Sequence, residues 1–439
     1  MRLEIPNSTA AANLKQILRA LRHRNFRLYL SGQAISLTGT WMQQIAMGWL
    51  VYRLTNSALL LGLVGFAGQI PALLLMSVAG VLADRWNCRR MLLVTQALAM
   101  VQAAAVATLA LTGLIHVWHI VVLAVFLGSV NAFDMPTRHT FLVQMVDDRN
   151  DLPSGIALHS TMFNAARLIG PSVAGVIVAA WNEGGCFLIN AVSYIAVLAA
   201  LFAMRVPAKP ADEAQPSVFE GLVDGVRYVL QTTPIKAILL LVAMVSFVGL
   251  PYAVLMPVFA RDVLHGGART FGFLVASSAA GSIVGAAYLA SRRTAVGLEK
   301  LIPIGLSASG LAIIGFASSR ALWLSMPMLI CAGCGMMIVF ASCNTLVQTV
   351  VEDSKRGRVM SLYTLSFMGT GPFGVLLAGA LAHKIGAPTT VAIYGAACLL
   401  AMGLYLLRLP SLTAALHPIH VRLGLVSQTV DPPNPDIRP

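Results

Sequence analysis

Residues 91–133 read MLLVTQALAMVQAAAVATLALTGLIHVWHIVVLAVFLGSVNAF and contain no Asp, Glu, Lys or Arg. A bilayer span needs about 20 mostly apolar residues, so this stretch is long enough for two spans. Its break falls at Gly113 to His119, where Gly, His and Trp occur as they often do at a membrane interface. The stretch therefore predicts two membrane-spanning helices joined by a short turn.

Similar stretches occur along the whole chain. One of them, 152–182, carries a single charge, Arg167, and counting residues 91–133 twice gives twelve helices in all. Backbone groups in lipid must be satisfied within their own segment, so helices are expected and no sheet pattern competes. The sequence thus predicts an all-α membrane protein with twelve transmembrane helices. The other uncharged runs are 28–52, 54–83, 184–204, 237–260, 270–291, 301–319, 321–351, 359–383 and 385–407.

The composition and the charges agree with this prediction. Hydrophobic residues make up 57% of the chain and charged residues 11%, against about 25% charged residues in a soluble domain. The net charge of +13 does not indicate a nucleic-acid partner, because the charges sort by side: 24 Lys and Arg lie in the tails and even-numbered loops, and five lie on the other side. This bias predicts a multi-pass protein with both termini in the cytoplasm. The five are Arg53, Arg261, Arg269, Arg320 and Lys384.

The longest polar interruption, between the sixth and seventh helices, divides the chain into two halves. We expect an N-terminal six-helix half at 28–204, a cytoplasmic linker with a short interfacial helix at 205–236, and a C-terminal six-helix half at 237–408. Residues 1–27 lack a signal peptide and predict a basic amphipathic segment on the inner leaflet. The Pro-rich tail, 409–439, is expected to be disordered and cytoplasmic.

The halves resemble each other in order. FLVQMVDD at 141–148 echoes TLVQTVVED at 345–353, and Gly170-Pro171 echoes Gly371-Pro372, with offsets of 204 and 201 residues. The similar offsets favour duplication over coincidence. Two parallel six-helix repeats with a site at their interface are the architecture of one class of secondary transporters.

A compact charged motif, GVLADRWNCRR, fills residues 80–90. It resembles the major facilitator signature G-x-x-x-D-R-x-G-x-R-R, with Asn87 in place of the second glycine; Asn tolerates a left-handed turn better than most residues. The resemblance implies the fold of that superfamily and a latch between the halves. The predicted latch residues are Gly80, Asp84, Arg85, Arg89, Arg90 and Asp134.

In this latch Asp84 would sit at the N-terminus of a helix of the other half, where unpaired N–H groups favour an anion. The resemblance implies that this helix is the eleventh, which begins near Val359. Arg85 and Arg89 would pair with nearby carboxylates, Asp134 being the best candidate. The alternative is that the arginines only anchor the loop at the inner face. The corresponding loop of the second half, 285–293, has no acid, so a single latch is predicted.

The fifth helix contains NAARLIGPSVAG at 164–175. It resembles, incompletely, the Gly-Pro signature in the fifth helix of major facilitator antiporters, with Ala174 in place of one glycine. Small residues let helices approach closely, and a proline bends a helix, so packing without a functional role is the alternative. The predicted packing and bending positions are Gly170, Pro171, Gly175, Gly371 and Pro372.

Polar side chains within the spans are candidates for the lining of a central cavity. A charge inside a span costs at least about 2.5 kcal/mol and normally faces a cavity or a partner. The first helix carries a polar stripe at helical spacing, which avoids lipid and faces either the cavity or neighbouring helices. The candidates are Gln33, Thr40, Gln43, Gln44, Asn131, Asn164, Arg167, Asn190, Tyr252, Asn344 and Tyr363.

Three further stretches, FDMPTRHTFLVQMV, NAARLIGPSVAG and EGLVDGVRYVLQTTP, look like the bacterial enterobactin-exporter-like, or transmembrane secretion effector, subfamily. The resemblance implies efflux of small amphiphilic, drug- or siderophore-like molecules from a bacterial inner membrane, driven by an ion gradient, by a monomer. No Asp or Glu lies deep in a span, so proton coupling falls to His159, to Asp134 or to the charge of the cargo.

Alternatives within the same fold are uptake and lipid flipping; a membrane-embedded sensor or enzyme is a further alternative. The sequence has no HExxH, GxSxG or Walker motif, so we expect no enzyme, no catalytic residue, no metal and no cofactor. The Cys331-x-x-Cys334 motif lies inside a span without partner ligands and is interpreted as helix packing.

Overall fold

The computed structural model describes residues 18–146, 148–204, 218–292, 294, 296–352 and 355–422, and these residues contain helices and no strand. For some helical residues, Asp84 and Arg85 among them, the backbone is described and the side chain is not. The elements are η1 (Arg19–Arg22), α2 (Arg24–Thr55), α3 (Ala58–Arg85), α4 (Cys88–Leu111), α5 (Val117–Gln144), η2 (Arg149–Asp151), α6 (Leu152–Ala180), α7 (Glu183–Ala203), α8 (Val218–Gln231), α9 (Thr233–Val248), η3 (Pro251–Leu255), α10 (Met256–Val258), η4 (Phe259–Val263), α11 (Ala268–Ser291), α12 (Leu298–Ser318), α13 (Leu322–Val350), α14 (Arg356–Ile385) and α15 (Ala387–Arg422).

In the described part of the chain, eleven helices are long and apolar enough to cross a membrane, residues 233–263 counting as one. The twelfth predicted span is α2, which has 32 residues but a lower mean hydropathy because of its Gln, Ser and Thr stripe. The predicted all-α transmembrane fold is confirmed. The seventh span departs from regular helix, since it passes through a 3-10 segment (η3) and a π-helical turn (η4).

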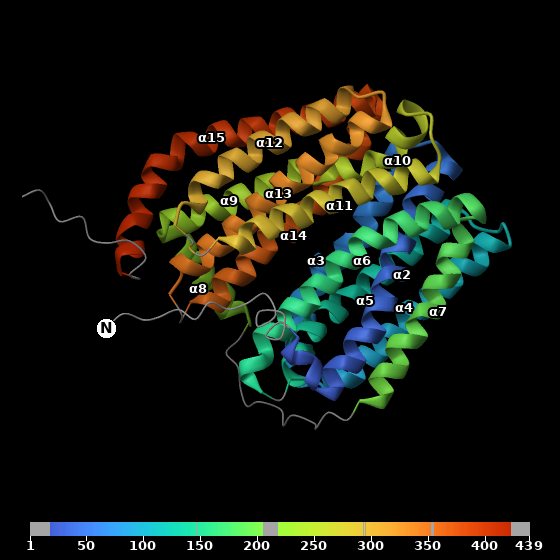
Figure 1. The fold of residues 1–439 in the computed structure, drawn as a ribbon, viewed down its shortest axis with the longest axis horizontal. Coiled ribbons are helices and arrows are strands. Elements are labelled where there is room, and N and C mark those ends of the chain that lie inside the picture. The colour runs from blue at the N-terminus through green and yellow to red at the C-terminus, as the bar shows by residue number, and fades with distance from the viewer. Residues whose placement is uncertain are drawn as a thin grey trace, which may run out of the picture.

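The helices form two bundles, α2 to α7 and α9 to α15 (Figure 1). Contacts between the bundles run mainly through α3 against α14 and α6 against α11. In each pair, the second helix of one bundle packs against the fifth helix of the other. This reciprocal arrangement is what a duplicated half produces when its copies face each other.

Glycine contacts close the interface at one end. A Cβ at Gly62 would lie 2.9 Å from the Cα of Gly379, and a Cβ at Gly175 would lie 2.9 Å from the carbonyl oxygen of Ala268. We call this the closed end; it carries the α2–α3 turn. Small residues allow this approach because no side chain separates the backbones.

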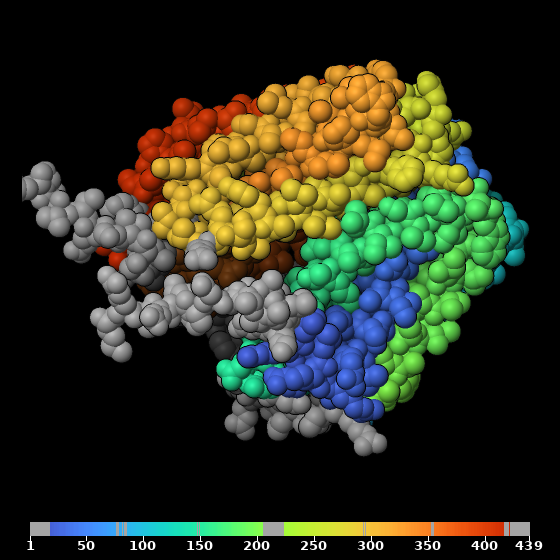
Figure 2. Space-filling view, viewed as in Figure 1, coloured from blue at the N-terminus to red at the C-terminus, as the bar shows by residue number. Residues whose placement is uncertain are grey.

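The bundles separate toward the other end, which carries α8 and the last turns of α15 (Figure 1). In the space-filling view α6 lies against α11 along the boundary between the bundles (Figure 2). A Cβ at Gly80, near this end of α3, would meet no atom within 4 Å. We call it the open end.

Two segment predictions need comment. The tail was expected to be disordered from 409, but α15 continues to Arg422, because Leu412 and Leu416, one turn apart, are buried and carry the helix past Pro410. Residues 423–439 and 1–17 lie outside the described residues.

The linker contains helix α8, Val218–Gln231, where a short helix was predicted. The cytoplasmic placement of these segments stays a prediction.

Candidate functional site

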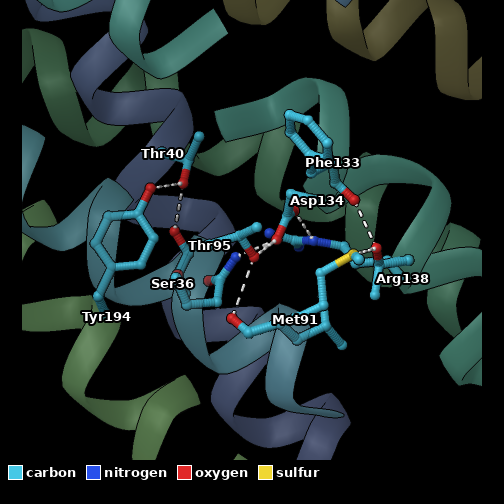
Figure 3. Close-up of polar contacts among 11 residues, drawn as sticks. Ser36, Thr40, Met91, Thr95, Phe133, Asp134, Arg138 and Tyr194 are labelled. Atoms are coloured by element: carbon cyan, nitrogen blue, oxygen red, sulfur yellow. Dashed lines mark hydrogen bonds and ion pairs between the residues drawn. The ribbon is translucent and has the colours of Figure 1, made fainter. Parts of the chain in front are cut away.

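A charge pair lies inside the N-terminal bundle, on α5. Asp134, 3% exposed, accepts hydrogen bonds from Thr95 Oγ1 at 2.8 Å and Gln96 Nε2 at 2.7 Å, both on α4. It also pairs with Arg138, one helical turn later (Figure 3). Because a buried ion must be paired and hydrogen-bonded to be tolerated, the two α4 side chains complete the environment of the carboxylate.

Arg138 extends this cluster to α2. The side-chain amide of buried Gln33 faces its guanidinium, and we assign the amide orientation in which its oxygen accepts from Arg138, because the opposite orientation would set donor against donor. Nearby, the rings of Tyr29 and His159 stack with centroids 6.0 Å apart, joining α2 to α6. The pair therefore links α2, α4 and α5 of one bundle, and the Tyr29–His159 stack joins α2 to α6 near it.

The predicted latch is changed by this geometry. Arg89 does not reach Asp134; it donates to the carbonyl oxygens of Leu201 at 2.8 Å and Phe202 at 2.9 Å, at the end of α7. Asp134 prefers Arg138 because the i,i+4 spacing brings the two side chains together on one helix face. Unpaired carbonyls at a helix C-terminus in turn favour the cation of Arg89.

Asn87 also acts differently from the prediction. Its φ is −68°, so it is not left-handed; its side chain caps α4 by accepting from the Arg90 N–H at 3.0 Å. The Arg90 side chain is exposed. The side chains of Asp84 and Arg85 lie outside the described residues, and so the latch itself stays a prediction.

The polar stripe of α2 bonds to neighbouring helices, which is the alternative that the sequence left open. Gln43 donates to Gln102 Oε1 on α4 at 2.9 Å and accepts from Asn190 Nδ2 on α7 at 2.7 Å. Thr40 lies 3.4 Å from the hydroxyl of Tyr194 (Figure 3). Gln44, on another face, is exposed.

The remaining candidates are scattered. Asn131 is exposed, Asn164 bonds within α6 to the Ser160 carbonyl at 2.9 Å, and Asn344 accepts from Gln348 on α13. Tyr363 is buried and donates to the Phe340 carbonyl at 2.8 Å inside the C-terminal bundle. These four are not brought together in one cluster.

Arg167 and Tyr252, by contrast, come from opposite bundles, on α6 and η3. The guanidinium carbon of Arg167 lies 5.8 Å from the centroid of the Trp41 ring on α2. Tyr252, on η3, interacts with Arg167 electrostatically, and its hydroxyl lies 3.2 Å from Ser278 Oγ. These two candidates therefore occupy the interface, where a repeat architecture places its binding site.

The Gly-Pro positions lie at helix contacts, with one exception. A Cβ at Gly170 would lie 2.6 Å from the Cβ of Trp41, and the carbonyl of Pro171 would lie 2.6 Å from a Cβ at Gly272. Gly371 has room for a Cβ; the tight position is Gly374, whose Cβ would lie 2.2 Å from the Phe247 carbonyl. Pro171 and Pro372 are buried inside continuous helices.

Sequence reasoning missed the contacts of the closed end. Tyr52 donates to Asp262 across the bundles, and Arg261 donates to Asn56 Oδ1 at 2.6 Å. A cavity of about 270 Å³ adjoins them, bounded also by His383. The sequence offered only single charged residues near span ends.

Arg138 was also missed, although Asp134 and Arg138 have the spacing of a helical ion pair.

Two interlocking helical bundles that are joined at one end and apart at the other define a membrane transporter of the major facilitator class. The fold is similar to that of a solved POT family transporter in complex with a thioalcohol-conjugated peptide. The match covers 89% of this chain and 97% of that one, with a TM-score of 0.69 and 13% sequence identity. The nucleoside transporter NupG matches with a TM-score of 0.66 and 14% identity, over 89% of this chain and 99% of that one. These similarities establish the fold.

The family is settled by sequence. The model of the transmembrane secretion effectors matches residues 16–434, so the chain belongs to this family. It is 28% identical to the staphyloferrin A transporter of Staphylococcus aureus, in a match that covers 84% of this chain and 92% of that protein. It is 26% identical over 80% of its length to 88% of the multidrug efflux pump Tap of Mycolicibacterium fortuitum, and 24% identical over 81% to 89% of macrolide efflux protein A of Streptococcus pyogenes.

Proposed function

We propose that this protein exports small amphiphilic, drug- or siderophore-like molecules across a bacterial inner membrane by alternating access. The observation that carries the proposal is a two-bundle interface held at one end and open at the other, in a chain of the secretion effector family. Rocking about the α3–α14 and α6–α11 contacts exposes the interface to one side and then to the other. Its role is that of a transporter working as a monomer, and not of an enzyme.

The open end faces the cytoplasm in this proposal. Lys and Arg are concentrated in the loops and tails on that side, as the positive-inside rule requires. The structure then corresponds to the state that accepts cargo from the cytoplasm. The Tyr52–Asp262 and Arg261–Asn56 contacts close the outer face and have to break before cargo leaves.

Export is driven by protons through Asp134. Protonation of this carboxylate removes the negative charge that Arg138 requires and leaves the guanidinium to Gln33 of α2. The hydrogen bonds among α2, α4 and α5 then rearrange, so a proton changes the packing of one bundle. His159, stacked on Tyr29 beside this cluster, is the second group available for the proton.

The predicted latch fits the register of α3 and α14. Contacts join 62 to 379, 66 to 373 and 73 to 369 in this antiparallel pair. Continued in the same register, position 84 falls at the level of residues 355–358, where α14 begins. When the bundles close at this end, an acid at position 84 would face unpaired N–H groups there and hold the two bundles together.

The test is transport by the purified protein in proteoliposomes, with ethidium as cargo and an imposed pH gradient. We expect ethidium movement that follows the gradient and stops when a protonophore collapses it. Movement without a gradient requirement would contradict proton coupling. Movement only in the opposite direction would favour uptake, and no movement of ethidium, a siderophore or a labelled lipid would contradict a transporter of this kind.

A further inference from the structure

The position of Arg167 is fixed by two helix contacts. α6 packs against α2 through Gly170, whose Cβ would lie 3.0 Å from the Thr38 carbonyl, and against α11 through Pro171. With about 3.6 residues per turn, Arg167 lies one turn earlier, in a direction between these two contacts. Its side chain therefore faces the interface between the bundles, on the open side of the contacts that close it.

The surroundings of Arg167 are aromatic and lack a carboxylate. The guanidinium lies over Trp41 at 5.8 Å, and Phe163 packs edge-on against Trp41 with centroids 5.7 Å apart. Among the described side chains none accepts a hydrogen bond from Arg167 or forms an ion pair with it; Tyr252, whose hydroxyl is neutral, supplies an electrostatic interaction but no counter-charge. Arg138 on α5, by comparison, has both a carboxylate and an amide.

A half-buried arginine inside a bilayer is costly unless an anion or cavity compensates it. The aromatic face recovers only part of that cost. The planar guanidinium has five donors and matches a carboxylate or phosphate with two parallel hydrogen bonds. The arrangement is that of a binding site in which one partner, the anion, comes from outside the protein.

We propose that Arg167, Trp41, Phe163 and Tyr252 bind the anionic group of an amphiphilic cargo. This rests on the proposed export function and specifies its substrate class. The carboxylate or phosphate of the cargo pairs with Arg167, Tyr252 donates a further hydrogen bond from the other bundle, and a flat apolar body packs on Trp41 and Phe163. The same charge repels cationic amphiphiles, so ethidium, the cargo of the transport test, would occupy the interface away from Arg167.

The experiment compares two probes with one aromatic body, pyrenebutyrate and a pyrenebutyl trimethylammonium, binding to the purified protein in phosphatidylcholine nanodiscs. We expect the wild type to prefer the carboxylate, and Arg167→Gln to weaken its binding by about tenfold or more, the loss of a charge-assisted hydrogen bond. Arg167→Lys keeps part of the preference. The control Arg320→Gln removes an exposed charge and leaves both affinities unchanged.

Equal binding of the carboxylate probe by Arg167→Gln and wild type, or no binding by the wild type, would overturn the inference. Each variant is first checked for a monodisperse elution profile and for thermal unfolding close to that of wild type. Arg167→Lys separates loss of the charge from loss of the fold, because it keeps the charge at the same position.

Two further arms separate the sources of the anion and the two proposals. Displacement of pyrenebutyrate by added phosphatidylglycerol in wild-type nanodiscs would assign the site to a lipid phosphate; persistence of binding would assign it to a soluble carboxylate. If Arg167-dependent binding is found but wild-type proteoliposomes transport neither probe nor ethidium, the anion site stands and the export function fails. If ethidium is transported and Arg167→Gln changes no affinity, the reverse holds.

Discussion

The two bundles are similar in architecture and different inside. Among the described residues, the N-terminal bundle buries amides and carboxylates, whereas the C-terminal bundle buries mainly hydroxyls, with Glu299 as an exception at the start of α12. Most of the large apolar cluster belongs to the C-terminal bundle. The buried polar residues of the N-terminal bundle are Gln33, Ser36, Gln43, Thr95, Gln96, Gln102, Asp134, Thr137, Asp151, Glu183, Asn190 and Ser193; those of the C-terminal bundle are Ser246, Ser277, Ser282, Glu299, Ser309, Ser319, Ser325, Ser342 and Thr390.

This difference indicates that the two bundles, although copies of one repeat, have different mechanical roles. Hydrogen bonds from amides and carboxylates are directional and depend on protonation, so they can be exchanged as a set. The packing of small and apolar residues responds neither to protons nor to the electric field across the membrane, and it keeps a bundle rigid. We infer that the N-terminal bundle carries the proton-sensitive element and that the C-terminal bundle moves against it as a unit.

The largest expected effect comes from removing the carboxylate of the buried pair. Asp134→Asn leaves Arg138 buried without its anion, which costs about 3–5 kcal/mol of unfolding free energy. Thermal unfolding in detergent should show a large decrease in stability, and gradient-driven transport should be lost. Arg138→Gln in the same chain should recover much of the stability without recovering transport. If Asp134→Asn alone were as stable and as active in transport as wild type, that result would contradict a coupling role for Asp134.

A smaller effect is expected from the amide network, and it tests the contrast between the bundles directly. Gln43→Leu leaves the Gln102 amide oxygen and the Asn190 amide N–H without their hydrogen bonds to Gln43. It should lower the free energy of unfolding by about 1–2 kcal/mol. Ser309→Ala, which removes a 3.1 Å bond to the Ala332 carbonyl in the C-terminal bundle, should cost about 0.5–1 kcal/mol. Thermal unfolding of both variants measures this order.

A double-mutant cycle sharpens the same comparison. Gln43→Leu and Asn190→Leu together should cost less than the two single variants added, with a coupling of about 0.6–1.7 kcal/mol. Additive costs would mean that the Gln43–Asn190 bond contributes nothing of its own. Equal costs for Gln43→Leu and Ser309→Ala would remove the distinction between the bundles.

The fold was predictable because lipid leaves the chain few options. Uncharged runs of span length are visible without any knowledge of contacts, and α2 was found despite its polar stripe because residues 28–52 carry no charge. The tail was misjudged where Pro410 and a Pro-rich end outweighed Leu412 and Leu416, whose spacing of four residues continues the apolar face of α15.

The site was predictable in its residues and less so in its pairings. Arg167 was recognised because charges in a span are rare, and Asp134 because it is a carboxylate near the latch arginines, but a single sequence does not choose between Arg89 and Arg138 as the partner of Asp134. The local i,i+4 spacing was the better guide. Contacts such as Gln43 with Asn190 or Tyr52 with Asp262 join residues far apart in sequence, and their register follows only from how the bundles pack.

The smallest effect concerns a third buried carboxylate of the N-terminal bundle, Asp151, at the start of α6. The duplication offset of 204 residues puts Lys355 at the equivalent position of the other half, so this feature is not shared. Arg22 donates to Asp151 at 2.8 Å and His23 contacts it at 3.1 Å; the hydrogen bond from Arg22, then that from His23, holds the pKa of Asp151 below its usual range. The ionised carboxylate therefore stabilises the folded state.

Because the folded pKa is depressed, this stabilisation is complete above the unfolded value, about 3.9, and is lost as the pH falls through the folded value. Thermal unfolding of Asp151→Asn should therefore begin below that of wild type at neutral pH, by a small amount since Arg22 is largely exposed, and the two should converge as the pH falls below about 4. Arg22→Gln removes the main cause of the shift and should flatten the same pH dependence. A gap between wild type and Asp151→Asn that persisted in acid would show that Asp151 acts through packing and not through its charge, and the pH response proposed for the N-terminal bundle would then rest on Asp134 and His159 without it.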